Sequence, residues 1–219
     1  DVAPSRGLGD VYKRQLMNRY TLGASVRMDG SDLFGVDKKY RFLPIYSVSG
    51  LYRISNEPFF KPATGWMDNL SLRLSYGLQG NIDKNTSPYL IGTYGTQTIL
   101  PNNTENSISI SSAPNDKLRW EKTASYNIGV DFSVLKSAIN LSVDYYYRKG
   151  TDLIGVKNLP LENGFNGMTI NWASMENKGI EVNLQTRNIT TRNFSWYTTF
   201  NFAYNYNCLL YTSPSPRDG

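Results

Sequence analysis

The chain has 219 residues, a formal net charge of +5, no histidine and a single cysteine, Cys208. Without imidazole, the chain can form no Ser/His/Asp or Cys/His nucleophilic site and no His-ligated zinc or haem site. One cysteine makes no intrachain disulfide, thiolate zinc cluster or CxxC redox pair. No apolar run approaches the roughly 18 residues that a transmembrane helix needs.

The positive charge is dispersed along the chain. The densest basic stretch, Lys38, Lys39 and Arg41, lies beside Asp37. Such mixed charge is typical of a solvated loop rather than of a surface that binds nucleic acid. We therefore expect no nucleic-acid partner.

The two ends of the chain differ from its interior. Residues 1–15 (DVAPSRGLGDVYKRQ) have neither a period of 2 nor one of 3.6, and residues 208–219 (CLLYTSPSPRDG) break abruptly from the aromatic-rich segment before them. Neither end has the features of a signal peptide. Both strings resemble translated sequencing-adapter sequence, so we expect two non-native tails around native residues 16–207. A pair of disordered tails is the alternative.

Between these ends, apolar and polar residues alternate in segments of about ten residues. In 69–81, Leu70, Leu72 and Leu74 fall on one face, and Ser71 and Arg73 fall on the other. A helix would place Arg73 on the same stripe as Leu70 and Leu74, so the alternation predicts a strand. In chain order, it predicts strands over 20–29, 41–55, 69–81, 120–132, 138–148, 178–188 and 194–207. Seven amphipathic strands indicate an all-β, antiparallel fold.

The polar sides of these strands carry charged residues that point away from the apolar sides, as a water-filled lumen permits. In 41–55 the alternation is blurred, because Leu43, Ile45 and Leu51 fall on the polar side. The residues predicted to face a lumen are Arg27, Asp29, Arg73, Glu121, Asp131, Asp144, Glu181 and Arg187.

The links between the strands are sorted by length. The longest, 82–119 and 149–177, take alternate places along the chain, so they gather at one rim, while the short links after Phe132 and Asn188 lie at the other. Outer-membrane barrels have this asymmetry. Aromatic residues near strand ends, such as Tyr20, Tyr76 and Trp120, suit the lipid headgroup boundary. The pattern predicts a fragment of an antiparallel transmembrane β-barrel, with a β-sandwich core as the alternative.

Several strand sequences are similar, in order, to blocks of the SusC/RagA family of TonB-dependent outer-membrane transporters from Bacteroidetes-type bacteria. They include RYTLGASVRMDGSDLFG (19–35), LRLSYGLQGN (72–81) and LRWEKTASYNIGVDF (118–132), followed by DYYYRKGTDLI, ENKGIEV and FSWYTTFNFAYNYN. Asp32, Leu51 and Tyr52 depart from the residues usual in the family. The resemblance covers nearly all of 19–207.

The resemblance implies a barrel of 22 strands preceded by a plug domain and a TonB box. Since this chain contains neither, we expect an internal fragment with about seven of those strands. The family's role implies uptake of oligosaccharides or peptides across the outer membrane of a Gram-negative bacterium. It also implies a capping SusD-like lipoprotein and energy supplied by TonB. We expect a wall segment in contact with outer-membrane lipid, with no enzymatic role and no cofactor.

The two longest links are where contact with substrate or with the capping lipoprotein is expected. Side chains there that could meet a sugar by hydrogen bonding and stacking are Asn102, Asn103, Asn106 and Trp172; ordinary polar loop positions are the alternative. Two other functions stay open: a soluble or surface carbohydrate-binding β-sandwich or adhesin module, and a glycosidase with Asp131 and Asp144 as acid and base.

Overall fold

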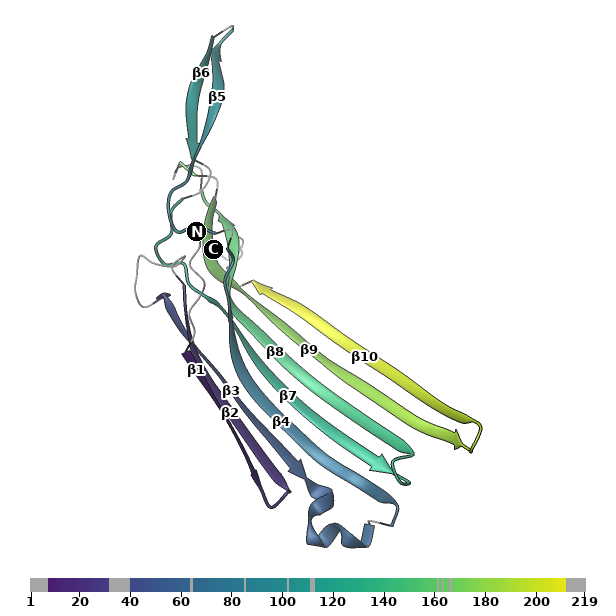
Figure 1. The fold of residues 1–219 in the computed structure, drawn as a ribbon. Helices are drawn as coiled ribbons and strands as arrows, with labels where there is room; N and C mark the ends of the chain where they lie inside the picture. Colours follow the sequence, from purple (N-terminus) through teal and green to yellow (C-terminus); the bar gives the residue numbers. More distant parts are fainter. Residues whose placement is uncertain are drawn as a thin grey trace, which may run out of the picture.

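The computed structural model describes residues 8–31, 40–63, 65–84, 86–101, 103–110, 113–160, 162, 164–165 and 167–211. Eight strands form one antiparallel sheet in the order β1-β2-β3-β4-β7-β8-β9-β10, and β5 and β6 form a separate hairpin (Figure 1). The strands are β1 (Leu8–Leu16), β2 (Tyr20–Gly30), β3 (Phe42–Arg53), β4 (Met67–Asn81), β5 (Gly92–Leu100), β6 (Asn103–Ile110), β7 (Glu121–Val134), β8 (Ile139–Asn158), β9 (Gly167–Thr190) and β10 (Ser195–Tyr211). Over these ranges, no helix has the length and apolar character needed to cross a membrane.

The seven predicted strands are confirmed as β2, β3, β4, β7, β8, β9 and β10. Two elements lie outside that prediction: β1, which pairs with β2 from Leu8↔Met28 to Leu16↔Tyr20, and the β5–β6 hairpin within the 82–119 link. β10 continues to Tyr211. Whether residues 1–15 and 208–219 are non-native is a question about the nucleotide sequence that the fold does not test, so their non-native origin stays a prediction.

The prediction of a long open link over 149–177 is wrong. β8 and β9 continue through most of it as a hairpin, paired from Leu153↔Ala173 to Asn158↔Gly167. The polar stretch that suggested a loop is an irregularity between Gly150 and Ile154, where the register shifts and Asp152 has a positive φ of 59°. Such bulges kink a strand without ending it. β8 and β9 therefore extend well beyond the ends that the alternation predicts.

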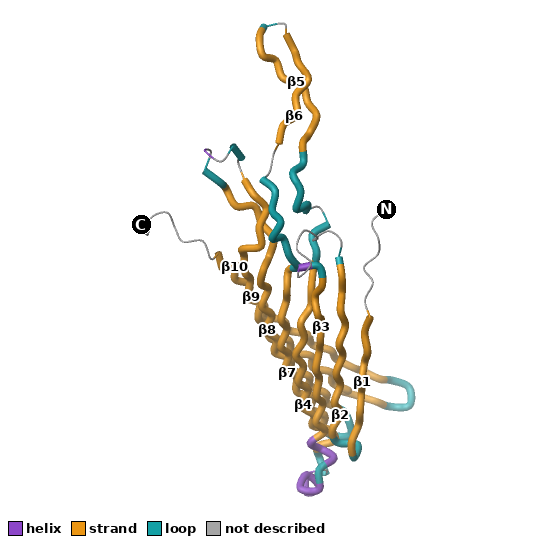
Figure 2. The backbone as a smooth tube through the Cα atoms, turned by 90° about the vertical axis from the view of Figure 1, so that its left-hand side faces the viewer, coloured by secondary structure: helices purple, strands orange, loops and turns teal. Residues whose placement is uncertain are grey.

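The predicted sorting of the links by length holds for the long link 82–119 and for the short links after Phe132 and Asn188. It fails elsewhere, because the link 54–66 lies with the short turns and is longer than the link 159–166 at the other end. The turns β1–β2, β3–β4, β7–β8 and β9–β10 lie at one end of the sheet, and the β5–β6 hairpin projects beyond the other end (Figures 1 and 2). We call these the short-turn end and the long-loop end. An antiparallel meander requires this alternation, because each strand reverses the chain direction.

The strand register gives the sheet one polar and one apolar face. Arg73, Gly129, Asp144 and Glu181 lie opposite one another in one row across β4, β7, β8 and β9. This row belongs to the polar face, and strand alternation places all eight predicted lumen-facing residues on that face.

The apolar face is exposed. Leu74 and Ile128 lie opposite each other on it, and each is 48% exposed. Within the described ranges, no second sheet packs on this face. A β-sandwich buries such a face between two sheets, and soluble monomers rarely expose apolar patches of this extent. The structure therefore opposes the β-sandwich alternative.

Aromatic side chains mark two levels on the apolar face. Toward the long-loop end, Tyr46, Tyr76, Tyr126 and Tyr147 form a continuous row, with successive ring centroids 5.9, 4.7 and 6.1 Å apart. Toward the short-turn end, Tyr20 stacks on Tyr52 with a centroid distance of 5.0 Å. The register places these two levels four residues apart along β3, because Tyr76 lies opposite Val48. Aromatic side chains of this kind are typical of the headgroup levels of membrane proteins.

Trp120 does not belong to such a belt, so its prediction as a boundary aromatic is wrong. It is 5% exposed and packs with Leu43 and Leu118, and its Nε1 donates to the Arg41 carbonyl at 3.2 Å. Ile45 also packs against this cluster. The blurred alternation at Leu43 and Ile45 thus reflects a small core where the segment 113–120 meets the strand ends.

At the short-turn end, the link between β3 and β4 is fastened by the buried carboxylate of Glu57. This carboxylate accepts hydrogen bonds from the Tyr20 hydroxyl at 2.7 Å and the Tyr52 hydroxyl at 3.3 Å, and it forms a 3.2 Å ion pair with Arg19. The three partners come from β2, β3 and the β1–β2 turn. Glu57 therefore joins two neighbouring connections.

We expect Glu57→Ala to destabilise the protein by about 1–2 kcal/mol, because the change leaves a cation and two hydroxyl groups without their shared acceptor. The measurement is the urea midpoint of unfolding in lipid vesicles. Asp116→Ala, on the segment 113–120 at the other end of the sheet, is the control. Equal midpoints for the two variants would contradict a fastening role for Glu57.

Candidate functional site

An ion-pair network occupies the centre of the polar face. The Arg73 guanidinium donates from Nε to Asp131 Oδ2 at 2.8 Å, and from Nη2 to Asp131 Oδ1 at 3.0 Å and to Asp144 Oδ2 at 2.9 Å. The Ser142 hydroxyl donates to Asp131 Oδ1 at 2.9 Å. Three neighbouring strands, β4, β7 and β8, thus contribute one cation, two carboxylates and one hydroxyl.

Gly129 makes this network possible. It lies between Arg73 and Asp144 in the row across β4, β7 and β8. A Cβ atom at position 129 would lie 2.5 Å from Asp144 Oδ1 and 2.8 Å from Arg73 Cζ. The absent side chain therefore lets the guanidinium reach across β7 to the carboxylate of β8.

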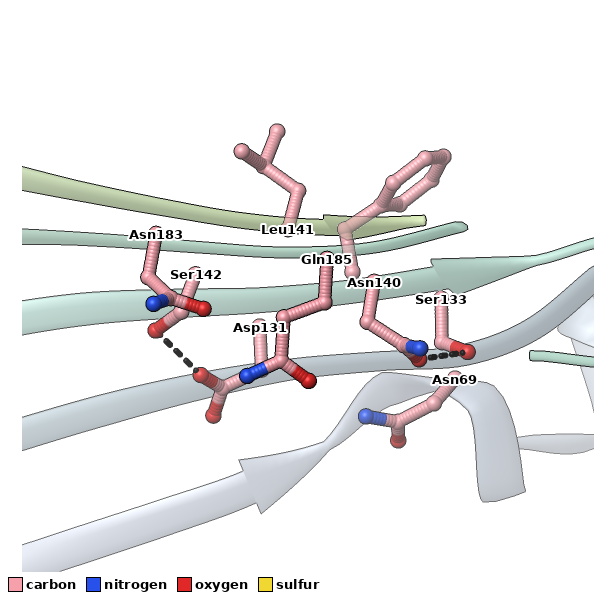
Figure 3. Close-up of a pocket in the computed structure, with 9 residues that line it drawn as sticks. Asn69, Asp131, Ser133, Asn140, Leu141, Ser142, Asn183 and Gln185 are labelled. Atoms are coloured by element: carbon pink, nitrogen blue, oxygen red, sulfur yellow. Dashed lines mark hydrogen bonds between the residues drawn. The ribbon is translucent and has the colours of Figure 1, made fainter. Parts of the chain in front are cut away.

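A shallow polar depression of about 230 Å³ lies beside the network, lined by Asp131, Ser142, Asn140, Asn183 and Gln185 among others (Figure 3). Asn140 accepts a 2.8 Å hydrogen bond from Ser133, and Asn183 donates to Asn201. Leu141 points to the opposite side of the sheet. The polar side chains that line the depression therefore come from the polar face, and Phe132 and Leu141 also contribute to its lining.

The depression does not resemble a catalytic or metal centre. Asp131 and Asp144, the pair considered for glycoside hydrolysis, are both held by the same guanidinium and the same hydroxyl. Both oxygens of Asp131 and Oδ2 of Asp144 thus already accept hydrogen bonds from the sheet itself. No group of three or more metal-ligating side chains occurs in the described part of the chain.

The other predicted lumen-facing residues do not join this cluster. Arg27 pairs with Asp29 at 2.8 Å on β2. Glu121 accepts hydrogen bonds from the Asn81 amide at 2.7 Å and the Ile154 backbone N–H at 2.8 Å. Arg187 donates to the Lys136 carbonyl at 2.8 Å in the β7–β8 turn, and Glu181 lies opposite Asp144 in the register. Their role as lumen-facing residues stays a prediction.

The four predicted loop contacts are not gathered in one place. Asn102 lies outside the described residues. Asn103 and Asn106 are exposed on β6 of the hairpin. Trp172 lies within β9, where it is half-buried, and its Nε1 is 2.8 Å from the position of a Cβ on Gly155. The structure brings Asn103 and Asn106 to one hairpin and places Trp172 on a different one.

One exposed aromatic on the hairpin was not among the predicted residues. Tyr94 lies opposite Ile108, shares a hairpin face with Asn106, and is 85% exposed. The alternation of Tyr94, Thr96 and Thr98, followed by Asn102-Asn103 and a second alternating run, was the signal that predicts this hairpin. Tyr94 is thus the ring best placed for stacking.

The base of the hairpin is tied to the β8–β9 extension. The Asn171 amide donates to the carbonyls of Arg119 and Asp152, each at 2.7 Å, and its oxygen accepts from the Arg119 N–H at 3.0 Å. Arg119 and Asp152 also form a 2.6 Å ion pair. The hydrogen bond that Arg119 donates to Asp152 raises the pKa of Arg119. Burial opposes ionisation of Asp152, but Arg119 outweighs it, so the pKa of Asp152 falls below its usual value of 3.8.

The lowered pKa of Asp152 predicts a stability term that depends on pH. The folded-state pKa lies below the unfolded-state value. The ionised carboxylate therefore contributes its full stabilisation to the folded state at neutral pH, and this stabilisation is lost as the pH falls through the folded-state pKa. We expect Asp152→Asn to lower the Tm of the protein at pH 7, and the difference from the parent to shrink at a pH well below 3.8. A difference of equal size at both pH values would contradict this account.

Known proteins are similar to this chain over almost its whole length. The family described as "TonB dependent receptor-like, beta-barrel" matches residues 13–219. The TonB-dependent receptor P39 of Formosa agariphila is 34% identical over 211 residues, which are 95% of this chain and 20% of that protein. The TonB-dependent receptor SusC of Bacteroides thetaiotaomicron is 33% identical over 198 residues, which are 88% of this chain and 19% of that protein.

Among solved structures, the RagAB peptide importer in its closed-closed state superposes with a TM-score of 0.78 at 27% identity, covering 94% of this chain and 22% of that chain. The chain spans about a fifth of the length of the curated relatives it matches. The structural match covers the partial barrel sheet described above.

Proposed function

Because the chain belongs to the TonB dependent receptor-like β-barrel family, we propose that it forms part of the barrel wall of a nutrient transporter in the outer membrane of a Gram-negative bacterium. In this role the apolar face contacts lipid and the polar face lines the lumen. The wall itself performs no chemistry.

The observation that carries this proposal is the division of the sheet into two faces. One face exposes apolar side chains such as Leu22, Val26 and Ile128, at 66%, 62% and 48%. The other carries an ion-pair network whose members pair with one another. Such a sheet is stable where lipid covers one side and water or a polar plug covers the other.

We propose oligosaccharides or peptides as the transported substrates, with a SusD-like lipoprotein and TonB as partners of the whole transporter. Two similarities support this: the family resemblance to SusC and RagA, and the match to a structure described as a peptide importer. In this account, the hairpin β5–β6 meets substrate or lipoprotein through Tyr94 and Asn106.

Uptake by living cells tests the proposal. We expect that deleting the gene abolishes uptake of one class of fluorescent oligosaccharide or peptide, and that returning the gene on a plasmid restores this uptake. Deleting TonB should abolish the same uptake. A deletion strain that imports every probe in a broad panel at the parental rate would contradict the transport role.

Removing the β5–β6 hairpin tests whether it acts in recognition rather than in the barrel wall. We expect replacement of residues 92–110 by a short Gly/Ser linker to leave the receptor inserted in the membrane but to lower lipoprotein co-purification or substrate uptake at least tenfold. The hairpin packs on no other strand of the described sheet, so the barrel does not need it. Unchanged substrate uptake and lipoprotein co-purification would contradict a role of the hairpin in recognition.

A further inference from the structure

Three lysines on three neighbouring strands lie on the apolar face, one in the row of tyrosines and two just beyond it. Lys178 of β9 lies opposite Tyr147, Lys149 of β8 lies one row further toward the long-loop end, opposite Ala124, and Lys122 of β7 lies one row further again, opposite Thr151. Diagonal neighbours of this kind are about 7–8 Å apart between backbones. The lysines therefore form a diagonal line in which the middle one, Lys149, lies about 7–8 Å from each of the other two. We call them the lysine diagonal.

The contacts of these lysines leave the line net positive. Lys149 approaches Glu176 Oε1 at 3.7 Å and Lys122 approaches Asp152 Oδ2 at 3.4 Å, both longer than a tight ion pair. Asp152 already pairs with Arg119 at 2.6 Å. The Lys178 ammonium lies over the Tyr206 ring, 5.2 Å from its centroid. The four cations Arg119, Lys122, Lys149 and Lys178 thus lie near only two carboxylates, those of Asp152 and Glu176.

The surroundings of the lysine diagonal indicate what covers it. Directly toward the short-turn end lie Tyr126 and Tyr147, at the level where an aromatic belt meets lipid headgroups. Beyond them the same face is apolar, with Ile128 exposed. An occupant must therefore present negative charge next to an apolar body. Lipids with phosphate headgroups have this chemistry, and basic side chains near a membrane surface attract them.

We propose that the lysine diagonal is a binding site for the phosphate of an anionic membrane lipid, whose acyl chains lie along the apolar face of β7, β8 and β9. This inference rests on the proposed membrane location of the sheet. It adds a lipid preference that barrel insertion by itself does not require. Each lysine contributes a comparable share, because none of the three is enclosed.

The experiment uses the intact receptor in neutral detergent, with anionic phosphatidylglycerol or zwitterionic phosphatidylcholine added as the probe. We expect phosphatidylglycerol to raise the Tm and phosphatidylcholine to have little effect. Lys149→Gln and Lys178→Gln should each weaken the apparent phosphatidylglycerol affinity about fivefold. Lys157→Gln, an exposed lysine further along β8, removes the same charge outside the line and should leave the affinity unchanged.

Inorganic phosphate at matched concentration distinguishes a lipid site from a phosphate site. We expect phosphate to leave the Tm unchanged; a rise equal to that with phosphatidylglycerol would overturn the assignment to lipid. Equal affinities for the Lys149→Gln, Lys178→Gln and Lys157→Gln variants would also overturn it. Insertion of the parent and of each variant into vesicles is measured in parallel. A parent that inserts normally but shows no preference for phosphatidylglycerol would contradict only this inference. A parent that fails to insert would contradict the proposed function.

Discussion

Ile128→Lys should prevent most of the receptor from reaching its folded, inserted state. Ile128 lies near the middle of the apolar face, opposite Leu74 of β4 and Tyr145 of β8. A lysine on the lipid face of a barrel costs about 2–4 kcal/mol at the midplane and about 0–1 kcal/mol at the interfaces, and Ile128 lies one row from Tyr126 toward the midplane. The measurement is the fraction of receptor that migrates as folded barrel on unheated gels after refolding into vesicles.

Asn127→Lys is the matched control. It introduces the same side chain one residue earlier in β7, and alternation places it on the polar face between Ser75 and Tyr146. We expect its folded fraction to equal that of the parent. If both variants folded equally well, the apolar face would not contact lipid.

Gly179→Val should produce the second large loss, because a side chain at this position meets backbone. A Cβ atom there would lie 2.5 Å from the Tyr204 carbonyl oxygen and 2.6 Å from Cζ of Tyr146. That carbonyl belongs to β10, which pairs with β9 at this position, so it cannot move aside without disturbing the ladder. We expect the free energy of unfolding to fall by about 3 kcal/mol, as measured by urea titration in vesicles.

The control for this prediction is Gly77→Val. Position 77 lies on the same face in β4, and its nearest neighbour, Ser47 Cβ, is at an ordinary contact distance of 3.4 Å. We expect a change below about 1 kcal/mol, since valine favours strands. A loss as large at position 77 as at position 179 would show that any side chain, rather than the crowding at Gly179, destabilises the sheet.

The alternation of side chains predicts most of the sheet. Strands over 69–81 and 178–188 follow from residues such as Leu72 and Val182, because a period of two is decisive wherever one face is apolar. The alternation of the links between the two ends of the sheet follows from the meander. The resemblance to the transporter family identifies the same architecture independently.

The features of the fold that the alternation pattern does not predict depend on contacts between segments far apart in the sequence. Trp120 fits the alternation of β7, but the fold-back of 113–120 onto Leu43 buries it. The polar stretch after Arg148 suggests a loop, although the partner strand from Gly167 keeps it extended. At the site, the sequence indicates that Arg73, Asp131 and Asp144 share a face. Their joining around Gly129 depends on the register, which no single strand encodes.

The central claim is that the two faces of this sheet meet lipid and water respectively. The most direct measurement places a nitroxide label on single cysteines in β7, in a Cys208→Ser background, and compares label accessibility to oxygen and to a water-soluble nickel chelate in vesicles. We predict high oxygen and low nickel accessibility at Ile128 and Val130, and the reverse at Asn127 and Asp131. Low accessibility to both reagents at Ile128 and Val130, as in a buried protein core, would contradict the account.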